Sequence, residues 1–293
     1  MKVIRAKSAG FCWGVERAIE TARACADGGK RVVYTDGPLI HNSQMMAVLK
    51  GEGIREVGDY ASRAPVDIAP EGAGRADAVI VVRAHGISPE RRAYLKSLGL
   101  EFRDGTCPDV GVIAGKIKLF ARKGYHTVIF GDPNHPEVLG LLGYAEGRGF
   151  VVRDEADIDA LPESIGGRVC MVSQTTMFTF DYRNLAAHLK RRFPSAEVLD
   201  TICGATKERQ GDIPNLKAQG AQAVIVIGGR HSANTVKLAG LVEREGLPCY
   251  HVETAAELDF DHLGASYSVV GVTAGASTPG FLIDDICARL AAL

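Results

Sequence analysis

Three of the seven cysteines share one kind of sequence context, which makes them candidates for metal ligands. They occur in Gly10-Phe11-Cys12-Trp13-Gly14-Val15, in Asp104-Gly105-Thr106-Cys107-Pro108 and in Asp200-Thr201-Ile202-Cys203-Gly204-Ala205-Thr206. Each lies in a turn just before a predicted helix; Cys107 follows Cys12 by 95 residues, and Cys203 follows Cys107 by 96. The pattern predicts three similar α/β units, each offering one thiolate toward a common centre, although the units show no convincing residue-by-residue identity.

The other four cysteines have a simpler interpretation. They are Cys25, Cys170, Cys249 and Cys287, which lie in helical or apolar strand-like runs. A lone cysteine in such a run is usually a small buried hydrophobe. The sequence contains no CxxC pair, which argues against a zinc ribbon or a ferredoxin-type cluster. Seven cysteines in such a chain indicate a reducing compartment, where they are metal ligands, catalytic thiols or buried hydrophobes rather than disulfides, and their number is odd.

Polar side chains mark the carboxyl ends of the predicted strands, two ends in each third of the chain. They are His41, His85, His135, Glu137, Thr175, Ser232, Asn234 and Ser277. Ligands of open α/β sheets bind beyond these ends, where helix N-termini point their N–H groups. Imidazoles, hydroxyls and an amide suit a phosphate or diphosphate. Lys and Arg are largely absent from these strand ends, so we expect binding by hydrogen bonds and helix dipoles.

Glu137 is the single acid in this set, two residues from His135. In an enclosed site beside a bound polyanion, the charged form of a carboxyl group is disfavoured. We therefore expect Glu137 to be stored protonated and to act as the proton donor.

Alternating strand-like and helical runs extend along the whole chain and predict an α/β fold with parallel sheets. The buried strand-like runs are Arg31–Thr35, Ala78–Val82, Thr127–Phe130, Val169–Val172, Ala223–Ile227 and Ser268–Val272. The helical runs are Val15–Ala26, Pro89–Leu98, Val110–Lys123, Tyr182–Arg192, Thr235–Glu245 and Pro279–Leu293. The cysteine spacing divides the chain into predicted domains at residues 1–106, 107–202 and 203–293. The Gly- and Ala-rich stretch Pro70–Ala76 is predicted to be a surface loop.

The composition is that of a globular protein that offers no large charged field. Of the 293 residues, 46% are hydrophobic and 24% charged, and the net charge is −1. Such a balance gives no basic surface for nucleic acid or for an anionic membrane. The chain enters a strand-like run at Met1–Ala6 with no signal-peptide or membrane-spanning segment, so we expect a cytoplasmic protein.

Seven motifs, taken together and in order, identify a family. They are Gly10-Phe11-Cys12-Trp13-Gly14-Val15-Glu16-Arg17-Ala18, Ala84-His85-Gly86, Asp104-Gly105-Thr106-Cys107-Pro108, His135-Pro136-Glu137-Val138, Ser173-Gln174-Thr175-Thr176, Thr201-Ile202-Cys203-Gly204-Ala205-Thr206 and Thr273-Ala274-Gly275-Ala276-Ser277. This set resembles the 4-hydroxy-3-methylbut-2-enyl diphosphate reductase (IspH/LytB) family, iron–sulfur oxidoreductases that complete the methylerythritol phosphate route to isoprenoids. The resemblance covers nearly the whole chain.

The resemblance implies a pseudo-threefold trefoil of three α/β domains around one [4Fe–4S] cluster. Its implied ligands are Cys12, Cys107 and Cys203, which leaves one iron open as a Lewis acid. It also implies diphosphate contacts and a proton-delivery group. The implied diphosphate residues are His41, His85, His135, Ser232, Asn234 and Ser277, and Glu137 delivers protons with Thr175 nearby. Ala233 stands where the family often has a second serine, so one side-chain hydrogen bond to the substrate is lost.

The implied reaction reductively removes the allylic hydroxyl of (E)-4-hydroxy-3-methylbut-2-enyl diphosphate and yields isopentenyl and dimethylallyl diphosphate. The sequence contains no GxGxxG fingerprint for a nucleotide, so the electrons are expected from ferredoxin or flavodoxin. Two alternatives stay open. One is a quinolinate-synthase-like lyase, which also holds a [4Fe–4S] cluster on three cysteines. The other is a non-catalytic α/β binding protein with incidental cysteines.

Overall fold

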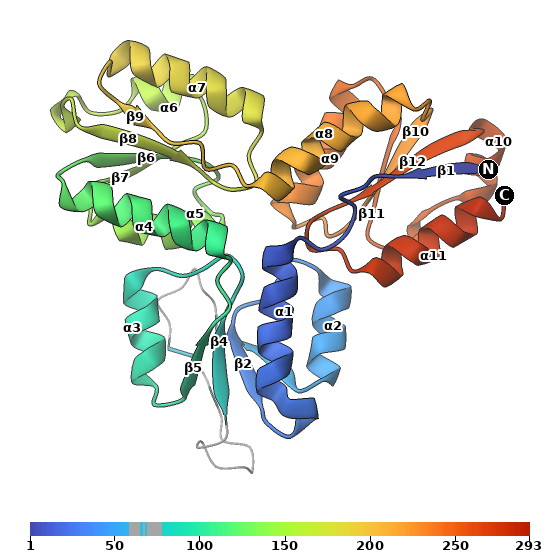
Figure 1. The fold of residues 1–293 in the computed structure, drawn as a ribbon, viewed down its shortest axis with the longest axis horizontal. Helices are drawn as coiled ribbons and strands as arrows, with labels where there is room; N and C mark the ends of the chain where they lie inside the picture. Colours follow the sequence, from blue (N-terminus) through green and yellow to red (C-terminus); the bar gives the residue numbers. More distant parts are fainter. Residues whose placement is uncertain (59–64, 67, 69–77) are drawn as a thin grey trace. The chain divides into compact units, whose positions relative to one another are not determined.

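The computed structural model describes residues 1–58, 65–66, 68 and 78–293, and over this part the chain is an α/β protein (Figure 1). Its strands form three four-stranded sheets, and neighbouring strands within each sheet are parallel. These features confirm the predicted fold class of three parallel-sheet α/β units. The stretch Pro70–Ala76, predicted to be a surface loop, lies outside the described residues.

The N-terminal sheet has the strand order β3-β2-β4-β5. Its strands are β2 (Val33–Asp36), β3 (Ile54–Val57), β4 (Val79–Val82) and β5 (Glu101–Asp104). The helices of this part are α1 (Trp13–Ala26), α2 (Ser43–Gly51) and α3 (Pro89–Ser97). All residues of β2 and β4 are buried, as expected for central parallel strands covered on both faces.

The middle sheet has the order β7-β6-β8-β9. Its strands are β6 (His126–Phe130), β7 (Gly149–Val152), β8 (Val169–Ser173) and β9 (Glu197–Val198). Its helices are α4 (Pro108–Arg122), α5 (Pro136–Leu142), α6 (Glu155–Asp159) and α7 (Thr179–Arg192). Alternate strand residues serve two cores: Val128 and Phe130 pack with residues of α7, whereas Ile129 packs with residues of α4 and α5.

The C-terminal sheet joins both ends of the sequence, with the order β1-β12-β10-β11. Its strands are β1 (Lys2–Arg5), β10 (Ala223–Ile227), β11 (Cys249–Val252) and β12 (Val269–Ala274). Its helices are α8 (Gly204–Ala218), α9 (Ala233–Arg244), α10 (Phe260–Ser266) and α11 (Gly280–Ala291). Ile225 and Ile227 pack with α10 and α11, and Val224 and Val226 with α8 and α9, so both faces are covered (Figure 1).

All three sheets have one topology. In the N-terminal and middle sheets the spatial order of the strands is second, first, third and fourth in the chain. The C-terminal sheet repeats this order from β11 to β12 and takes β1 as its fourth strand. Cys12, Cys107 and Cys203 therefore have equivalent positions, because each follows a fourth strand and directly precedes a helix. The similarity predicted from cysteine spacing thus has a topological basis.

The described chain divides into two compact units. Unit 1 comprises Met1–Val15, His41–Met46 and Cys203–Leu293, and unit 2 comprises Glu16–Ile40 and Ala47–Ile202. Unit 1 holds the C-terminal sheet, and unit 2 holds the other two. The domain boundaries at residues 106 and 202 stay a prediction. Strand β1 belongs to the first predicted domain by sequence, but it pairs with β12 in the sheet of the last third.

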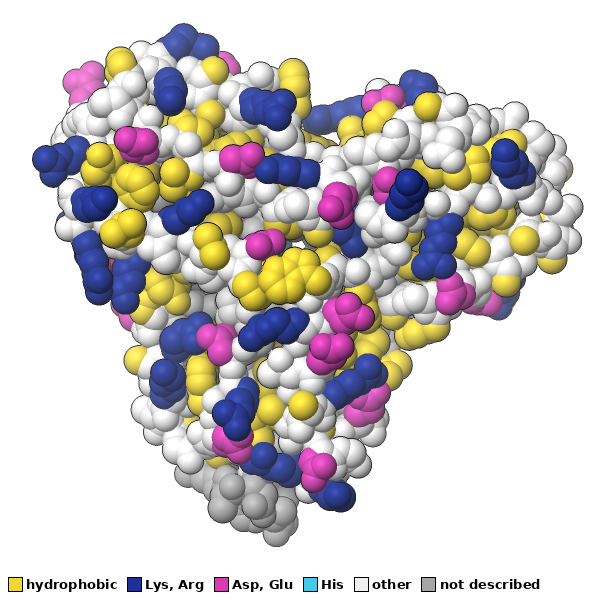
Figure 2. Space-filling model, viewed as in Figure 1, with side chains coloured by type: hydrophobic (Ala, Val, Ile, Leu, Met, Phe, Trp, Pro, Cys, Tyr) yellow, Lys and Arg dark blue, Asp and Glu magenta, His cyan; other side chains and the backbone are white. Residues whose placement is uncertain are grey.

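The surface and the helices agree with the sequence composition. On the face drawn in Figure 2, basic and acidic side chains are mixed, in keeping with a net charge of −1. Among the described helices, none combines the length and the apolar character needed to cross a bilayer.

Candidate active site

The expected site residues follow the two central strands of each sheet, which are β2 and β4, β6 and β8, and β10 and β12. In the N-terminal and middle sheets the chain leaves these two strands in opposite directions, toward β3 and β5 and toward β7 and β9. The region beyond the carboxyl ends of two such strands is the usual ligand position of an open α/β sheet. Strands β10 and β12 have the corresponding central positions in the C-terminal sheet. The structure places the expected residues in two sets, one in each unit.

In unit 2, His85 stands on a loop that contacts the Cys107 turn. The Cys107 N–H donates to Ala84 O at 2.9 Å, and the Gly105 N–H donates to Val82 O at 3.0 Å. A Cβ atom at Gly105 would lie 2.3 Å from Val82 O, so only glycine permits this approach. The predicted ligand Cys107 and the predicted substrate contact His85 are therefore held side by side by backbone hydrogen bonds.

A cavity of about 380 Å³ opens beside these two residues. Cys107 and His85 both line it, together with glycines of α4 and α5 that leave the space. The cavity wall also carries Arg17, whose Nη1 donates to Thr106 O at 3.0 Å, next to the Cys107 turn. The half-buried Cys107 thus borders a space large enough for a bound group.

Glu137 and Thr175 form a two-point contact that joins the ends of β6 and β8. Glu137, in the first turn of α5, is 1% exposed. Its Oε1 accepts from the Thr175 N–H at 2.7 Å, and its Oε2 accepts from the Thr175 hydroxyl at 2.6 Å. Both oxygens are thereby fixed in one orientation. The structure brings the predicted proton donor and its predicted neighbour into direct contact.

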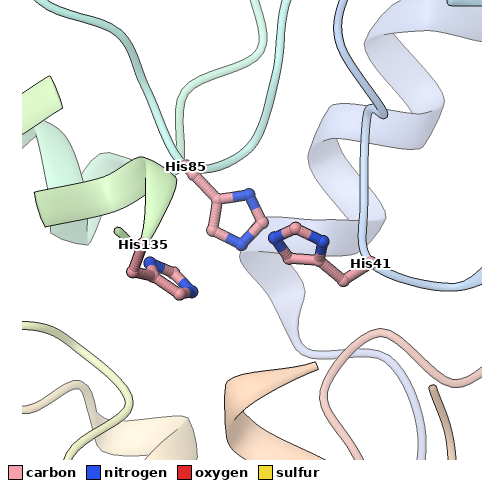
Figure 3. Close-up of side chains that lie close together, drawn as sticks. All are labelled: His41, His85 and His135. Carbon is pink, nitrogen blue, oxygen red and sulfur yellow. The ribbon is translucent and has the colours of Figure 1, made fainter. Parts of the chain in front are cut away.

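His135 caps the helix that carries Glu137. Its Nδ1 accepts from the Glu137 N–H at 3.2 Å, and the residue is 7% exposed. The ring centroids of His85 and His135 lie 5.4 Å apart in an edge-to-face arrangement, as Figure 3 shows for these two side chains. The histidines of two different sheets in unit 2 are therefore neighbours.

In unit 1, His41 and Ser277 are hydrogen-bonded. The Ser277 hydroxyl donates to His41 O at 3.0 Å, and Ser277 follows β12. The segment 41–46 is also tied to the sheet through Gln44, whose Nε2 donates to Glu253 at 3.3 Å. His41 is thus attached to the same crevice as the residues that follow β10 and β12.

The start of α9 supplies the remaining polar groups of unit 1. Ser232 caps this helix by accepting from the Thr235 N–H, and Ala233 is its first residue. Asn234 is 6% exposed, and its Nδ2 has no hydrogen-bond partner among the described residues. A buried donor without a partner is costly, so this group is available to an acceptor oxygen from a ligand or a water molecule.

Cys12 and Cys203 share a neighbour in unit 1, the guanidinium group of Arg209. Arg209 is 2% exposed, and it donates to Gly10 O at 2.6 Å and to Ala205 O at 2.8 Å. Burial lowers the pKa of Arg209, while the two thiols act in the opposite direction. Its hydrogen bonds connect the turn before Cys12 to the helix that follows Cys203.

Cys12 and Cys203 each stand directly before the first residue of a helix, α1 and α8. The Cys12 N–H donates to Ala276 O at 3.0 Å, which holds Cys12 next to the residue before Ser277. Cys203 caps α8, and its sulfur accepts from the Thr206 N–H at 3.4 Å. Helix N-termini stabilise thiolates, so these positions suit metal ligands.

Of the four cysteines predicted to be buried packing residues, two are buried, Cys25 and Cys170, and two are half-buried, Cys249 and Cys287. Cys25 lies in α1, Cys170 in β8, Cys249 in β11 and Cys287 in α11. Burial raises the pKa of each of these thiols, to about 11 for Cys249. A metal ligand must lose its thiol proton, and a raised pKa makes that loss more costly.

Sequence reasoning missed two buried arginines, Arg83 and Arg209. Arg83 is fully buried directly after β4, although Lys and Arg were expected to be largely absent from the strand ends. For Arg209 a signal did exist in the sequence. The buried face of α8 comprises Thr206, Arg209, Ile213 and Leu216, so Arg209 occupies an apolar-face position at helical spacing.

The chain belongs to the LytB protein family, whose family model matches residues 3–291. It is 62% identical over 293 residues to a protein of Opitutus terrae, with all of both chains covered. It is 37% identical over 292 residues to a protein of Alkaliphilus oremlandii, with 99% of each chain covered. Both relatives carry the name 4-hydroxy-3-methylbut-2-enyl diphosphate reductase.

Two solved structures agree with this family. One is the E-1-hydroxy-2-methyl-but-2-enyl-4-diphosphate reductase of Plasmodium falciparum, which is 28% identical, with a TM-score of 0.87 over 98% of this chain and 87% of that chain. The other is described as (E)-4-hydroxy-3-methyl-but-2-enyl diphosphate reductase, the terminal enzyme of the non-mevalonate pathway. It is 33% identical, with a TM-score of 0.69 and full coverage of both chains. Family membership favours a reductase over the quinolinate-synthase-like lyase and over a non-catalytic binding protein.

Proposed function

We propose that this chain is a 4-hydroxy-3-methylbut-2-enyl diphosphate reductase that forms isopentenyl and dimethylallyl diphosphate. The reaction takes up two electrons and two protons, breaks the allylic C–O bond and releases the hydroxyl group as water. The full-length similarity to reductases supports this function. The observation that carries it is the equivalent position of Cys12, Cys107 and Cys203 after the fourth strands of three sheets.

We propose further that these three cysteines hold one [4Fe–4S] cluster. The residues present fit this group, because each cysteine directly precedes a helix and none forms a disulfide. The buried Arg209 also fits, since a guanidinium beside Cys12 and Cys203 is best balanced by thiolates. When bound, the cluster would supply the two electrons, one at a time, and one iron without a protein ligand.

The polar groups at the strand ends would hold the diphosphate. In unit 1, the buried Asn234 Nδ2 needs an acceptor, which a diphosphate oxygen supplies. Ser232, Ala233 and Ser277 lie at the same strand ends, with His41 hydrogen-bonded to Ser277. Ala233 offers only its backbone N–H. In unit 2, the proposed substrate contacts are His85, His135 and Thr175.

Glu137 would deliver the protons. Its carboxyl group is buried and fixed by the two hydrogen bonds from Thr175, so it can be aimed at one reacting position without reorganisation. The electrons would come from a separate protein such as ferredoxin or flavodoxin, because the sequence carries no nucleotide fingerprint.

The test of this function is anaerobic purification, followed by iron analysis and a reductase assay with an artificial electron donor. Wild-type protein should be brown and should convert the substrate to the two products, identified by mass spectrometry. Cys107→Ser should lose the iron chromophore and all turnover. The matched control is Cys287→Ser, which removes a thiol with a raised pKa and should keep both. A colourless wild-type protein, or a cluster-replete Cys107→Ser variant, would contradict the proposal.

A further inference from the structure

Arg83 is a fully buried arginine directly behind a proposed substrate contact. It follows β4, is 0% exposed and stands two residues before His85. An arginine side chain stays protonated in proteins, and a buried charge is costly unless it makes specific interactions. Glu56 lies in β3, which is separated from β4 by β2, and interacts electrostatically with Arg83: burial raises the pKa of Glu56, and Arg83 opposes that rise.

The contact between Arg83 and His85 has only one chemical interpretation. Arg83 Nη2 lies 3.2 Å from His85 Nδ1. A guanidinium group can donate hydrogen bonds but cannot accept them, so the histidine Nδ1 must be the acceptor. A neutral ring that accepts at Nδ1 carries its proton on Nε2.

His135 reaches the same state by a different contact. Its Nδ1 accepts from the Glu137 backbone N–H at 3.2 Å, which again leaves the proton on Nε2. The rings of His85 and His135 are adjacent, with centroids 5.4 Å apart (Figure 3). Two neighbouring Nε2–H donors suit the oxygens of one anion. At His135 the backbone sets the tautomer, whereas at His85 a side chain does so.

We propose that Arg83 is a positioning residue that fixes His85 in the Nε2–H form, so that His85 donates a hydrogen bond to the substrate diphosphate. This inference rests on the proposed function. Arg83 contacts Nδ1 of the His85 ring, and it affects the substrate only through His85, without touching it. Without Arg83, the His85 ring is released to the other tautomer or to another orientation, and the substrate loses a donor.

The test is a double-variant cycle on the substrate Kd of the iron-loaded enzyme, measured without reductant so that no turnover occurs. Arg83→Met removes the donor and should weaken binding about tenfold, as expected for the loss of one hydrogen bond to a charged group. Arg83→Lys keeps a donating cation and should bind within a few-fold of wild type. His85→Ala should weaken binding by itself, and adding Arg83→Met to His85→Ala should weaken it no further.

Additive effects of Arg83→Met and His85→Ala would overturn the proposal, because a merely structural arginine acts independently of His85. Equal losses in Arg83→Lys and Arg83→Met, at normal iron content, would overturn it as well. If Arg83→Met does not fold, Arg83→Gln takes its place in the same cycle. Failure of the proposed function is distinguishable, because wild-type protein would then neither bind the substrate nor turn it over.

Discussion

The middle and C-terminal sheets both carry polar side chains beyond the carboxyl ends of their two central strands, but these side chains differ in whether they already have hydrogen-bond partners. After β6 and β8, Glu137 and Thr175 already hydrogen-bond each other at 2.6 and 2.7 Å. After β10 and β12, Asn234 leaves a buried Nδ2 without a partner among the described residues. The Glu137 carboxyl group thus has its partners within the protein, whereas the Asn234 amide has a buried donor that a ligand can satisfy.

This difference separates two roles within one proposed site. A carboxyl group held in a fixed orientation is suited to proton transfer, which requires a precise position. A buried donor without a partner is suited to binding, since an anion that fills it recovers a hydrogen bond. We therefore expect substitution of Glu137 to act on kcat and substitution of Asn234 to act on KM.

The largest effect is expected for Glu137→Gln. The amide keeps the shape and can retain contacts with Thr175 but cannot deliver a proton, so kcat should fall by about 10²–10⁴-fold with KM little changed. Steady-state kinetics with an artificial donor measures both constants. The control is Glu163→Gln, an exposed position in the turn before β8, which should leave both unchanged. Near wild-type turnover in Glu137→Gln would remove the proton-donor role.

Asn234→Ala should show the opposite pattern. Loss of a hydrogen bond to a charged ligand costs about 1.5–3 kcal/mol, which corresponds to a rise in KM of roughly 10–100-fold. At saturating substrate, kcat should stay within a few-fold of wild type. Asn215→Ala, at an exposed position of α8, is the matched control. If Asn234→Ala lowers kcat and spares KM, the assignment of binding to the C-terminal sheet is wrong.

Thr175→Val tests how far the fixed carboxyl orientation matters. Valine removes the hydroxyl bond to Glu137 Oε2 and keeps the backbone bond to Oε1. Because one buried hydrogen bond is worth about 1–3 kcal/mol, kcat should fall roughly 5- to 100-fold, less than in Glu137→Gln. Thr175→Ser retains a hydroxyl and should recover most of the rate. Equal losses in both variants would show that the hydroxyl bond to Glu137 is not what sustains the rate, because the serine retains it.

The smallest effect is expected for Ala233→Ser. The substitution introduces a hydroxyl group directly after Ser232, at the first residue of α9. An added hydroxyl at this helix start offers the diphosphate one more donor, so KM should fall by a few-fold at unchanged kcat. Kinetics over a range of substrate concentrations measures the change. An increase in KM would mean that this position has no room for the hydroxyl.

Much of this fold was predictable because its central strands are buried on both faces. The apolar runs that predicted strands correspond to β2, β4, β6, β8, β10 and β12, which are the two central strands of each sheet. Outer strands gave a weaker signal: β5 reads Glu-Phe-Arg-Asp, and β9 has two residues. The pairing of β1 with β12 joins opposite ends of the chain, and no local pattern specifies such a contact.

Site residues were predictable where a recognisable motif follows a predicted strand. They were harder to predict where a residue's role depends on whether its side chain is buried. Glu137 and Thr175 are named by their motifs, and the structure adds that they touch. Arg83 was missed because a charged residue at the end of a strand is normally expected to be solvated. Only the three-dimensional structure shows that its side chain is buried and directed at His85.

The most direct test of the division between a catalytic and a binding crevice is the substrate Kd of the iron-loaded protein without reductant, for three proteins. They are the wild type, Glu137→Gln and Asn234→Ala. Glu137→Gln should bind the substrate within about threefold of wild type, whereas Asn234→Ala should bind it at least about tenfold more weakly. The reverse order, with binding lost in Glu137→Gln and retained in Asn234→Ala, would contradict it.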